Sequence, residues 1–310
     1  MGKLAFVFSG QGAQKPGMGI ELAETAVGAA QVFSMAEELR PGTYRQCAQG
    51  SAQELAQTVN TQPCLYCVDL AAAQALRERG FVPRAVAGFS LGEIPALAFA
   101  GCLDWQDAFR FVMKRGAYME ECAQANPGAM YAVLKLAEAD VEALCSALPG
   151  CWPVNYNSPG QVVVACLEER AESLCAKVKE AGGRAVKLAV SGAFHSPLME
   201  EAAQRLEAEF SQLPFTVTSI PVYANTTARP YTDRSLLFRQ LKSPVLWRQT
   251  VEHLAAEGFD TFVEVGVGKT LQGLIAKTLP EAAVLHVEDR NTLEQALQIL
   301  EERMGPDAGE

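Results

Sequence analysis

Gly88-Phe89-Ser90-Leu91-Gly92 follows a short apolar run at residues 85–87 and precedes residues 93–100, whose pattern predicts a helix. A strand, a tight turn that carries a serine, and a helix form the setting in which G-x-S-x-G is a nucleophile elbow. The glycines permit a sharp turn, and the free N–H groups of the helix would face negative charge near Ser90. A glycine-rich turn with an inert serine is the alternative, so the rest of the chain has to decide between the two.

The composition is that of a globular protein. The chain has 310 residues, of which 49% are hydrophobic and 20% are charged, enough for one large or two modest domains. A net charge of −10 argues against a general nucleic-acid role. The first strand lacks the features of a signal peptide, and no apolar run has the length of a membrane span. Nine scattered cysteines, an odd number, suit reduced thiols, so we expect a cytoplasmic protein.

Cys64 and Cys67 form a C-x-x-C pattern inside a helix expected over residues 62–79. The sequence has no second pair at the spacing that zinc requires. We therefore favour packing thiols over redox chemistry, and we predict no metal site.

A glycine-rich loop follows the first expected strand, Leu4–Phe8. It reads Ser9-Gly10-Gln11-Gly12-Ala13-Gln14, and the two glycines that flank Gln11 would allow its backbone N–H to face a ligand. A flexible loop between a strand and a helix explains the same residues, so both readings stay open here.

Asp104 is a candidate N-cap for a helix whose apolar residues recur at helical spacing from Trp105 onward. Lys114 falls on the polar side of this helix and is expected in solvent. Arg115 falls on an apolar edge. There it either extends its charged end to solvent or is held in a partly dry site that binds an anion.

Residues 127–191 change in character. Strands and helices are expected in the order β-α-β-β-α-β, which is the ferredoxin-like unit. We predict a small subdomain over residues 127–191, inserted in a larger α/β domain made of residues 1–126 and 192–310.

His195 is the best candidate for a base that would serve Ser90. It stands just before Ser196 and Pro197, which predict a helix start, at the junction that leaves the small subdomain. The other two histidines, His253 and His286, are expected to be structural or exposed. An ordinary histidine at a helix start is the alternative.

The last third returns to alternating strands and helices. Gly266-Val267-Gly268 follows the expected strand at residues 261–265 and precedes a helix over residues 270–279. It is a weak signal for a phosphate loop, and a tight turn explains it equally well.

Several of these stretches occur together in one family. The chain resembles the malonyl-CoA:acyl carrier protein transacylases, which are freestanding acyltransferases of fatty-acid synthesis. The matching stretches run in the order of that family along residues 4–290. The matching stretches are Phe8-Ser9-Gly10-Gln11-Gly12, Gly88-Phe89-Ser90-Leu91-Gly92-Glu93, Arg115-Gly116, Asn155-Tyr156-Asn157-Ser158-Pro159-Gly160-Gln161-Val162-Val163, Ala193-Phe194-His195-Ser196-Pro197-Leu198-Met199, Pro244-Val245-Leu246-Trp247 and Glu264-Val265-Gly266-Val267-Gly268-Lys269-Thr270-Leu271.

Four positions depart from the pattern of that family. It usually has Pro where Ser9 and Val267 stand and His where Phe89 stands, and Leu246 is often polar or charged there. The first two changes alter the stiffness of loops, and Phe89 removes a polar group beside the candidate nucleophile.

The resemblance implies a hydrolase-like α/β domain with an inserted ferredoxin-like subdomain, and an acyl transfer in two steps. Ser90 would attack the thioester of malonyl-CoA while His195 takes its proton. A backbone carbonyl near Leu246 would hold the imidazole, and the backbone N–H groups of Gln11 and Leu91 would form the oxyanion hole. Malonyl-Ser90 would then pass the group to the phosphopantetheine thiol of acyl carrier protein.

The resemblance also implies the specificity. Arg115 would bind the malonyl carboxylate, and acetyl would leave that charge unpaired. Phe194 would crowd a 2-methyl branch, and Asn157 and Leu246 would support the pocket. We expect a monomer with no permanently bound cofactor, acting with acyl carrier protein. A serine esterase or thioesterase, an acyltransferase of a polyketide pathway and a noncatalytic binding module are the alternatives.

Overall fold

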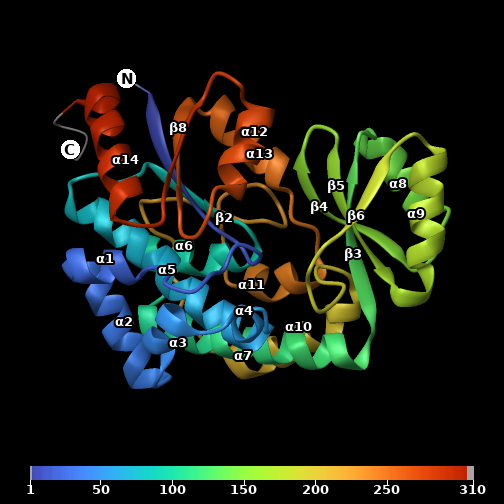
Figure 1. Cartoon of the computed structure of the whole chain (residues 1–310), viewed down its shortest axis with the longest axis horizontal. Helices are drawn as coiled ribbons and strands as arrows, with labels where there is room; N and C mark the ends of the chain where they lie inside the picture. The colour runs from blue at the N-terminus through green and yellow to red at the C-terminus, as the bar shows by residue number, and fades with distance from the viewer. Residues whose placement is uncertain (1, 306–310) are drawn as a thin grey trace.

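A five-stranded parallel sheet forms the centre of the larger part of the molecule (Figure 1). The computed structural model describes residues 2–305. The strands lie in the order β7 (Val222–Tyr223), β2 (Ala85–Gly88), β1 (Lys3–Phe8), β8 (Phe259–Val265) and β9 (Ala283–Val287), and each neighbouring pair is parallel. The carboxyl ends of the strands therefore meet at one edge of the sheet.

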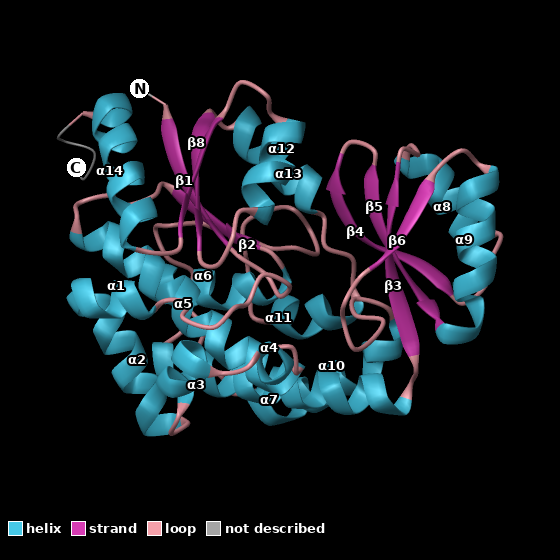
Figure 2. Cartoon of the chain, viewed as in Figure 1, coloured by secondary structure: helices cyan, strands magenta, loops and turns pink. Residues whose placement is uncertain are grey.

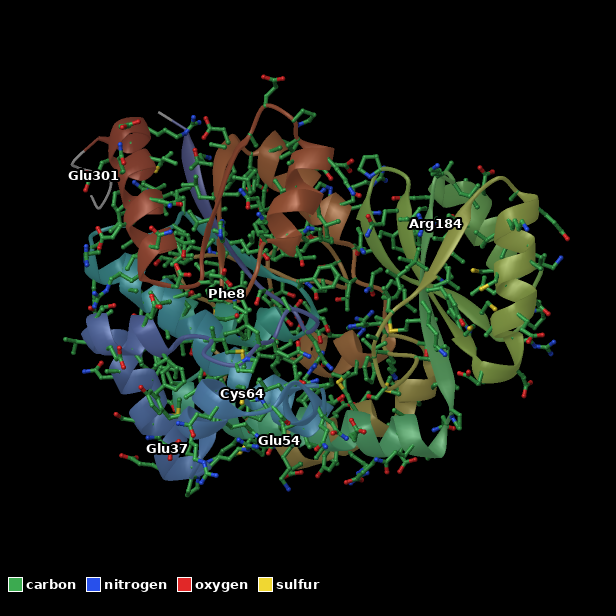
Figure 3. All side chains as sticks on the ribbon, in the orientation of Figure 1. Phe8, Glu37, Glu54, Cys64, Arg184 and Glu301 are labelled. Carbon is green, nitrogen blue, oxygen red and sulfur yellow. The ribbon has the colours of Figure 1, made fainter. Side chains whose placement is uncertain are left out.

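Helices cover both faces of this sheet, because the central strand β1 is apolar on both sides. Ala5 and Val7 pack with α12 and α13, whereas Phe6 and Phe8 pack with α5 and α6. Phe8 lies near the middle of the molecule in Figure 3. The helices of this part are α1 (Ile20–Thr25), α2 (Val27–Leu39), α3 (Thr43–Gln49), α4 (Ala52–Leu55), α5 (Thr58–Glu78), α6 (Glu93–Ala100), α7 (Trp105–Ala125), α10 (Glu200–Phe210), α11 (Ser235–Arg239), α12 (Trp247–Ala256), α13 (Thr270–Thr278) and α14 (Arg290–Met304).

A second sheet, separate from the first, is antiparallel and four-stranded (Figure 2). Its strands lie in the order β4 (Cys151–Ser158), β5 (Gln161–Leu167), β3 (Gly128–Leu134) and β6 (Arg184–Lys187). The helices α8 (Glu138–Ser146) and α9 (Ala171–Glu180) pack on one face of it. The opposite face, which includes Met130, Ala132 and Val163, packs with residues of the larger part.

The predicted fold class is confirmed: the chain is an α/β protein with a parallel sheet and a separate antiparallel subdomain of βαββαβ order. The boundaries set at residues 127 and 191 stay a prediction, and the strands of the subdomain occupy residues 128–187. Strand β4 runs to Ser158 and β5 begins at Gln161, so a short turn joins the two strands. Within the described part of the chain, no helix is both long and apolar enough to cross a membrane.

Candidate active site

The elbow at Ser90 has the geometry that the sequence predicts. Strand β2 ends at Gly88, a short 3₁₀ turn spans Ser90–Gly92, and α6 follows. Ser90 takes a φ of 54°, a left-handed value that is uncommon outside glycine. A Cβ atom on Gly88 would lie 2.0 Å from the carbonyl carbon of Gly92, and one on Gly92 would lie 2.3 Å from the carbonyl oxygen of Phe8. Both glycines are needed because the turn presses directly on its own backbone and on β1.

Ser90 and His195 are 105 residues apart in sequence and in hydrogen-bond contact in space. The Oγ atom of Ser90 lies 2.7 Å from Nε2 of His195, and Nδ1 of His195 lies 2.9 Å from the carbonyl oxygen of Gln240. A carbonyl oxygen only accepts, so Nδ1 carries the proton and Nε2 is free to accept from Ser90.

His195 is buried, and this burial lowers its pKa to about 4, with the positive charge of Arg115 as the second cause. The imidazole is therefore neutral at pH 7. A neutral imidazole beside a hydroxyl has the protonation state that a general base requires.

The sequence predicts that the carbonyl that holds His195 lies near Leu246, and this prediction is wrong. The carbonyl that contacts His195 Nδ1 belongs to Gln240, the first residue of a 3₁₀ turn over Gln240–Lys242. The carbonyl of Leu246 instead accepts from the backbone N–H and the hydroxyl of Thr250, in the first turn of α12. A carbonyl occurs on every residue, so nothing in the side-chain pattern singles out Gln240.

Arg115 is fully buried on α7, so its charged end does not extend to solvent, which was one of the two alternatives that the sequence left open. Its Nη2 donates to Ser90 Oγ at 3.2 Å and to Gln240 Oε1 at 2.8 Å, while its Nε and Nη1 atoms have no partner among the described residues. Burial lowers its pKa to about 10, so it stays charged at pH 7. Lys114, as expected, is on the outside, 3.0 Å from Glu209.

Asn225 holds the elbow and was missed by the sequence analysis. Its Oδ1 accepts from the backbone N–H of Ser90 at 2.7 Å, and its Nδ2 donates to the carbonyl of Gly88 at 2.6 Å. The signal that could have found it is its position, because it follows strand β7 at the edge where Ser90 follows β2, and carboxyl ends of parallel strands meet there.

Glu93 supports Asn225 from the first turn of α6 and was also missed. It accepts from the backbone N–H of Asn225 at 2.6 Å and from the hydroxyl of Tyr231. It is fully buried, and burial raises its pKa to about 7. A chain of buried hydrogen bonds therefore runs from Tyr231 through Glu93 and Asn225 to Ser90.

A cavity of about 270 Å³ opens beside Ser90, between the larger part and the antiparallel sheet. The predicted residues that line it are Gln11, Ser90, Asn157, Phe194 and His195. Leu91 is buried, and it follows Ser90 in the 3₁₀ turn. Leu246 and Arg115 are not in the wall of the cavity; Arg115 lies behind Ser90 and Gln240.

The remaining candidate features have structural places. His253 Nδ1 contacts the carbonyl of Ala228 at 2.7 Å, and His286 lies in β9. Cys64 and Cys67 are both fully buried in α5, as packing thiols would be. Across residues 2–305, no cluster of histidine, cysteine or acidic side chains has the arrangement of a metal site.

The loop at Gly266 does not have free helix N–H groups for a phosphate. The carboxylate of Glu264 accepts from the N–H groups of Leu271 and Gln272 at the start of α13, and Glu288 accepts from that of Gly268 at 2.9 Å. A second negative group there would meet two carboxylates. The tight-turn interpretation of this loop is therefore the correct one.

Phe89 also has a structural place. Its ring packs edge-on against that of Trp247, with the ring centroids 5.6 Å apart. The residue that departs from the family pattern is thus part of the apolar cluster under α12, while its other side lines the cavity.

Several known proteins are similar to this chain in sequence and in structure over almost their whole length. Residues 5–296 match the family model described as an acyl transferase domain. The malonyl CoA-acyl carrier protein transacylase of Bacillus subtilis is 38% identical, with 97% of this chain and 98% of that protein covered. The crystal structure of the malonyl CoA-acyl carrier protein transacylase from Clostridium perfringens aligns with a TM-score of 0.93 at 35% identity, over 97% of this chain and 98% of that one. A chain from the complex of a type II polyketide-synthase acyl-carrier protein with its malonyl-transacylase also aligns with this one. The TM-score is 0.91 at 35% identity, over 96% of this chain and 99% of that one.

Proposed function

The chain belongs to the malonyl CoA-acyl carrier protein transacylases of the acyl transferase family, enzymes that transfer malonyl groups to acyl carrier protein, and we propose that it does so through a malonyl ester on Ser90. The observation that carries the proposal is the hydrogen bond of 2.7 Å between Ser90 Oγ and a buried, neutral His195. A hydroxyl and a neutral imidazole at this distance have the geometry of nucleophile and base.

In the first half-reaction, Ser90 Oγ attacks the thioester carbonyl of malonyl-CoA and His195 Nε2 takes its proton. The new C–O bond forms, the C–S bond breaks, and the coenzyme A thiolate leaves with the proton from His195. In the second, His195 takes the proton of the phosphopantetheine thiol of the carrier as its sulfur attacks the malonyl ester. A new C–S bond forms, the C–O bond to Ser90 breaks, and Ser90 Oγ receives the proton from His195. The carbonyl of Gln240 keeps Nδ1 protonated and the ring oriented throughout, as the carboxylate of a triad would.

The oxyanion hole is proposed to consist of the backbone N–H groups of Gln11 and Leu91. The contact at Asn225 supports this choice, because it already occupies the N–H of Ser90. The amide that follows the nucleophile is then the donor that the elbow offers to a developing oxyanion.

Arg115 is proposed to bind the carboxylate of the malonyl group. Its support is the pair of buried Nε and Nη1 donors that lack a partner, on a guanidinium that touches Ser90. A carboxylate can accept charge-assisted hydrogen bonds from a guanidinium, whereas an acetyl group has no carboxylate to accept them. Phe194 and Asn157 line the cavity beside Ser90, consistent with the proposed roles of crowding a branched acyl group and of supporting the pocket, whereas Arg115 reaches Ser90 from outside the cavity wall.

We propose that the malonyl groups serve fatty-acid synthesis in the cytoplasm, with the enzyme acting as a monomer. The similarity to the malonyl CoA-acyl carrier protein transacylase of Bacillus subtilis supports the transfer to a carrier protein, and nine free thiols suit a reducing compartment. A polyketide pathway is the alternative, favoured by the alignment with the malonyl-transacylase of the polyketide complex. Transfer rates to a fatty-acid carrier and to a polyketide carrier, measured side by side, distinguish the two.

The proposed chemistry is tested by intact mass after the protein is mixed with malonyl-CoA. We expect an added malonyl group that peptide mapping assigns to Ser90 and that a carrier protein with a free phosphopantetheine thiol removes. Ser90→Ala is the control and should gain no mass while it keeps its thermal stability, since the change removes one hydroxyl. Release of free malonate without a detectable adduct would favour a serine esterase or thioesterase. A full adduct on the Ser90→Ala protein would show that another residue is the nucleophile.

A further inference from the structure

A buried hydrogen bond ties the loop that carries Gln11 to helix α5. The hydroxyl of Ser9 donates to Oδ1 of Asp69 at 2.8 Å, with 2% of Ser9 and none of Asp69 exposed. Asp69 stands among apolar side chains of α5, where an acid is costly unless it is paired. The steps of the proposed reaction use neither residue.

Two loops close over this pair. A Cβ atom on Gly266 would lie 1.9 Å from Asp69 Oδ1 and 2.6 Å from Ser9 Oγ, so the backbone after β8 presses on the hydrogen bond itself. A Cβ atom on Gly268 would lie 3.1 Å from that of Ala13, so the loop over residues 9–14 and the loop over residues 266–269 lie against each other. Asp69 therefore lies against both loops, with Ser9 of one loop and Gly266 of the other next to its carboxyl group.

The surroundings of Asp69 favour the neutral acid. Its Oδ2 atom has no partner among the described residues, and burial raises its pKa well above the ordinary value. The negative charge of Glu264 of β8 raises the pKa of Asp69 further, while the hydrogen bond from Ser9 lowers it. The carbonyl oxygen of a neutral carboxyl also accepts a hydrogen bond, although more weakly than a carboxylate, so the contact with Ser9 requires no charge.

We propose that Asp69 is a positioning residue that holds the backbone N–H of Gln11 in place through Ser9. The inference rests on the proposed function, because it assumes that this N–H is an oxyanion donor. Gln11 is two residues from Ser9, whose own N–H donates to the carbonyl of Val265 at 3.2 Å. The hydroxyl adds a second attachment at the same residue, so the start of the loop is held on two sides.

The consequence is a loss in rate with little loss in binding. An oxyanion donor acts in the transition state, so a displaced Gln11 amide should lower the acylation rate constant at saturating malonyl-CoA and leave KM nearly unchanged. Complete loss of one such donor costs on the order of 10²–10³ in rate, so a loosened loop should cost about tenfold or somewhat more.

The test compares Ser9→Ala, Asp69→Ala, Asp69→Asn and the double variant Ser9→Ala/Asp69→Ala, by rapid-quench formation of the malonyl-enzyme. We expect a fall of about tenfold for both single alanine variants, and no further fall in the double variant, because one contact is lost in each case. Asp69→Asn should recover most of the rate, since its amide oxygen still accepts from Ser9. Thr61→Val is the matched control: it removes a buried hydroxyl bond on the same helix, to Leu55, away from the cavity.

Equal losses of thermal stability in the Ser9, Asp69 and Thr61 variants, with unchanged acylation rate constants, would overturn the proposal and leave Asp69 a structural residue. So would Asp69→Asn behaving like Asp69→Ala. Failure of the proposed function is a separate result: the unaltered protein would then form no malonyl adduct at all. The unaltered protein is therefore measured first, and the variants are compared only with its adduct.

Discussion

Arg115 Nη2 lies 3.2 Å from Ser90 Oγ, so a fully buried cation touches the proposed nucleophile. That oxygen is also the partner of His195, and the charge on Arg115 therefore opposes formation of the imidazolium. A malonyl carboxylate paired with Arg115 would remove that opposition. The proposed role of Arg115 would therefore couple substrate binding to the basicity of His195.

We predict that this coupling is visible in the pH dependence of acylation. His195 must be neutral to accept a proton, so the rate is lost as the pH falls through its pKa. For the free enzyme that pKa is about 4, and kcat/KM for acylation by malonyl-CoA should fall near that pH. At saturating malonyl-CoA the acylation rate should be lost at a higher pH, because the bound carboxylate cancels the charge of Arg115. The pH at which the rate is lost is called the acidic limb of the profile below. Single-turnover acylation at low and at saturating malonyl-CoA measures both limbs.

Arg115→Ala is the control for this prediction. Removal of the charge should move the acidic limb of kcat/KM to higher pH, toward the ordinary histidine pKa of 6.5. Burial still lowers the pKa of His195, so the limb should stay below that value. Limbs that coincide at low and saturating malonyl-CoA would show that Arg115 and His195 are not coupled through the substrate.

His195→Ala should slow both half-reactions, because one imidazole serves as base and acid in each. A general acid–base group contributes about 10²–10⁴ in rate, so acylation and transfer to the carrier should each fall by a factor in that range. Rapid-quench acylation and a chase of preformed malonyl-enzyme with carrier protein measure the two steps separately. His253→Ala is the matched control, since that ring contacts only the carbonyl of Ala228 in the hydrogen bonds of the described chain. Normal acylation with slow carrier transfer would contradict the two proposed roles.

Asn225→Ala should lower both rate and stability, because it leaves the N–H of Ser90 and the carbonyl of Gly88 without partners. Each unsatisfied buried group costs about 1–3 kcal/mol. Asn225→Asp should recover only part, since a carboxylate accepts from Ser90 but does not donate to Gly88. The measurements are thermal unfolding and the acylation rate constant. Asn60→Ala is the control, because its amide donates to the carbonyl of Glu54 far from the cavity, and it should leave acylation unchanged. Equal acylation by both variants would mean that Asn225 does not position the elbow.

Local sequence predicted much of the fold and the side chains at the centre of the candidate site. The elbow at Ser90 follows from glycines that a tight turn requires, and Arg115 was placed on an apolar edge of α7, which left open whether its charged end is buried. Ser196 does cap the short helix after His195, with its hydroxyl accepting from the N–H of Leu198. These features depend on neighbours within a few residues, so periodicity and capping rules reach them.

The sequence patterns did not predict the contacts between residues that are far apart in the chain. The carbonyl of Gln240 meets His195 only because the 3₁₀ turn at Gln240–Lys242 packs against the segment before α10, and a backbone carbonyl has no residue signature. Asn225 meets Ser90 because β7 pairs with β2 across 135 residues of sequence. Ser9 looked like a loop residue because its partner, Asp69, stands in a helix that the sequence indicated to be a packing element.

Arg115 should determine the choice between malonyl and acetyl groups. Its unpaired Nε and Nη1 atoms are buried beside Ser90, so Arg115→Ala removes the donors proposed for the malonyl carboxylate and also vacates space. Malonyl transfer should fall by orders of magnitude, since a buried charge that loses its partner costs about 2–5 kcal/mol. Acetyl transfer should fall little or even rise, because no unpaired charge then faces the methyl group. Arg115→Lys should recover only part of malonyl transfer, because an ammonium does not offer two parallel hydrogen bonds.

Lys114→Ala is the internal control for this series, because that side chain is on the solvent side of the same helix and pairs with Glu209. It should leave both substrates almost unchanged, as expected for an exposed ion pair. The measurement is kcat/KM for malonyl-CoA and acetyl-CoA on the unaltered protein and the three variants. Arg115 also donates to Gln240, whose side chain in turn donates to the carbonyl of Ser90, so a purely structural role would disturb the elbow itself. Such a disturbance would lower transfer of both acyl groups by the same factor. A change in the ratio of the two substrates is therefore the result that assigns Arg115 to the carboxylate, and an unchanged ratio would assign it to the support of Ser90.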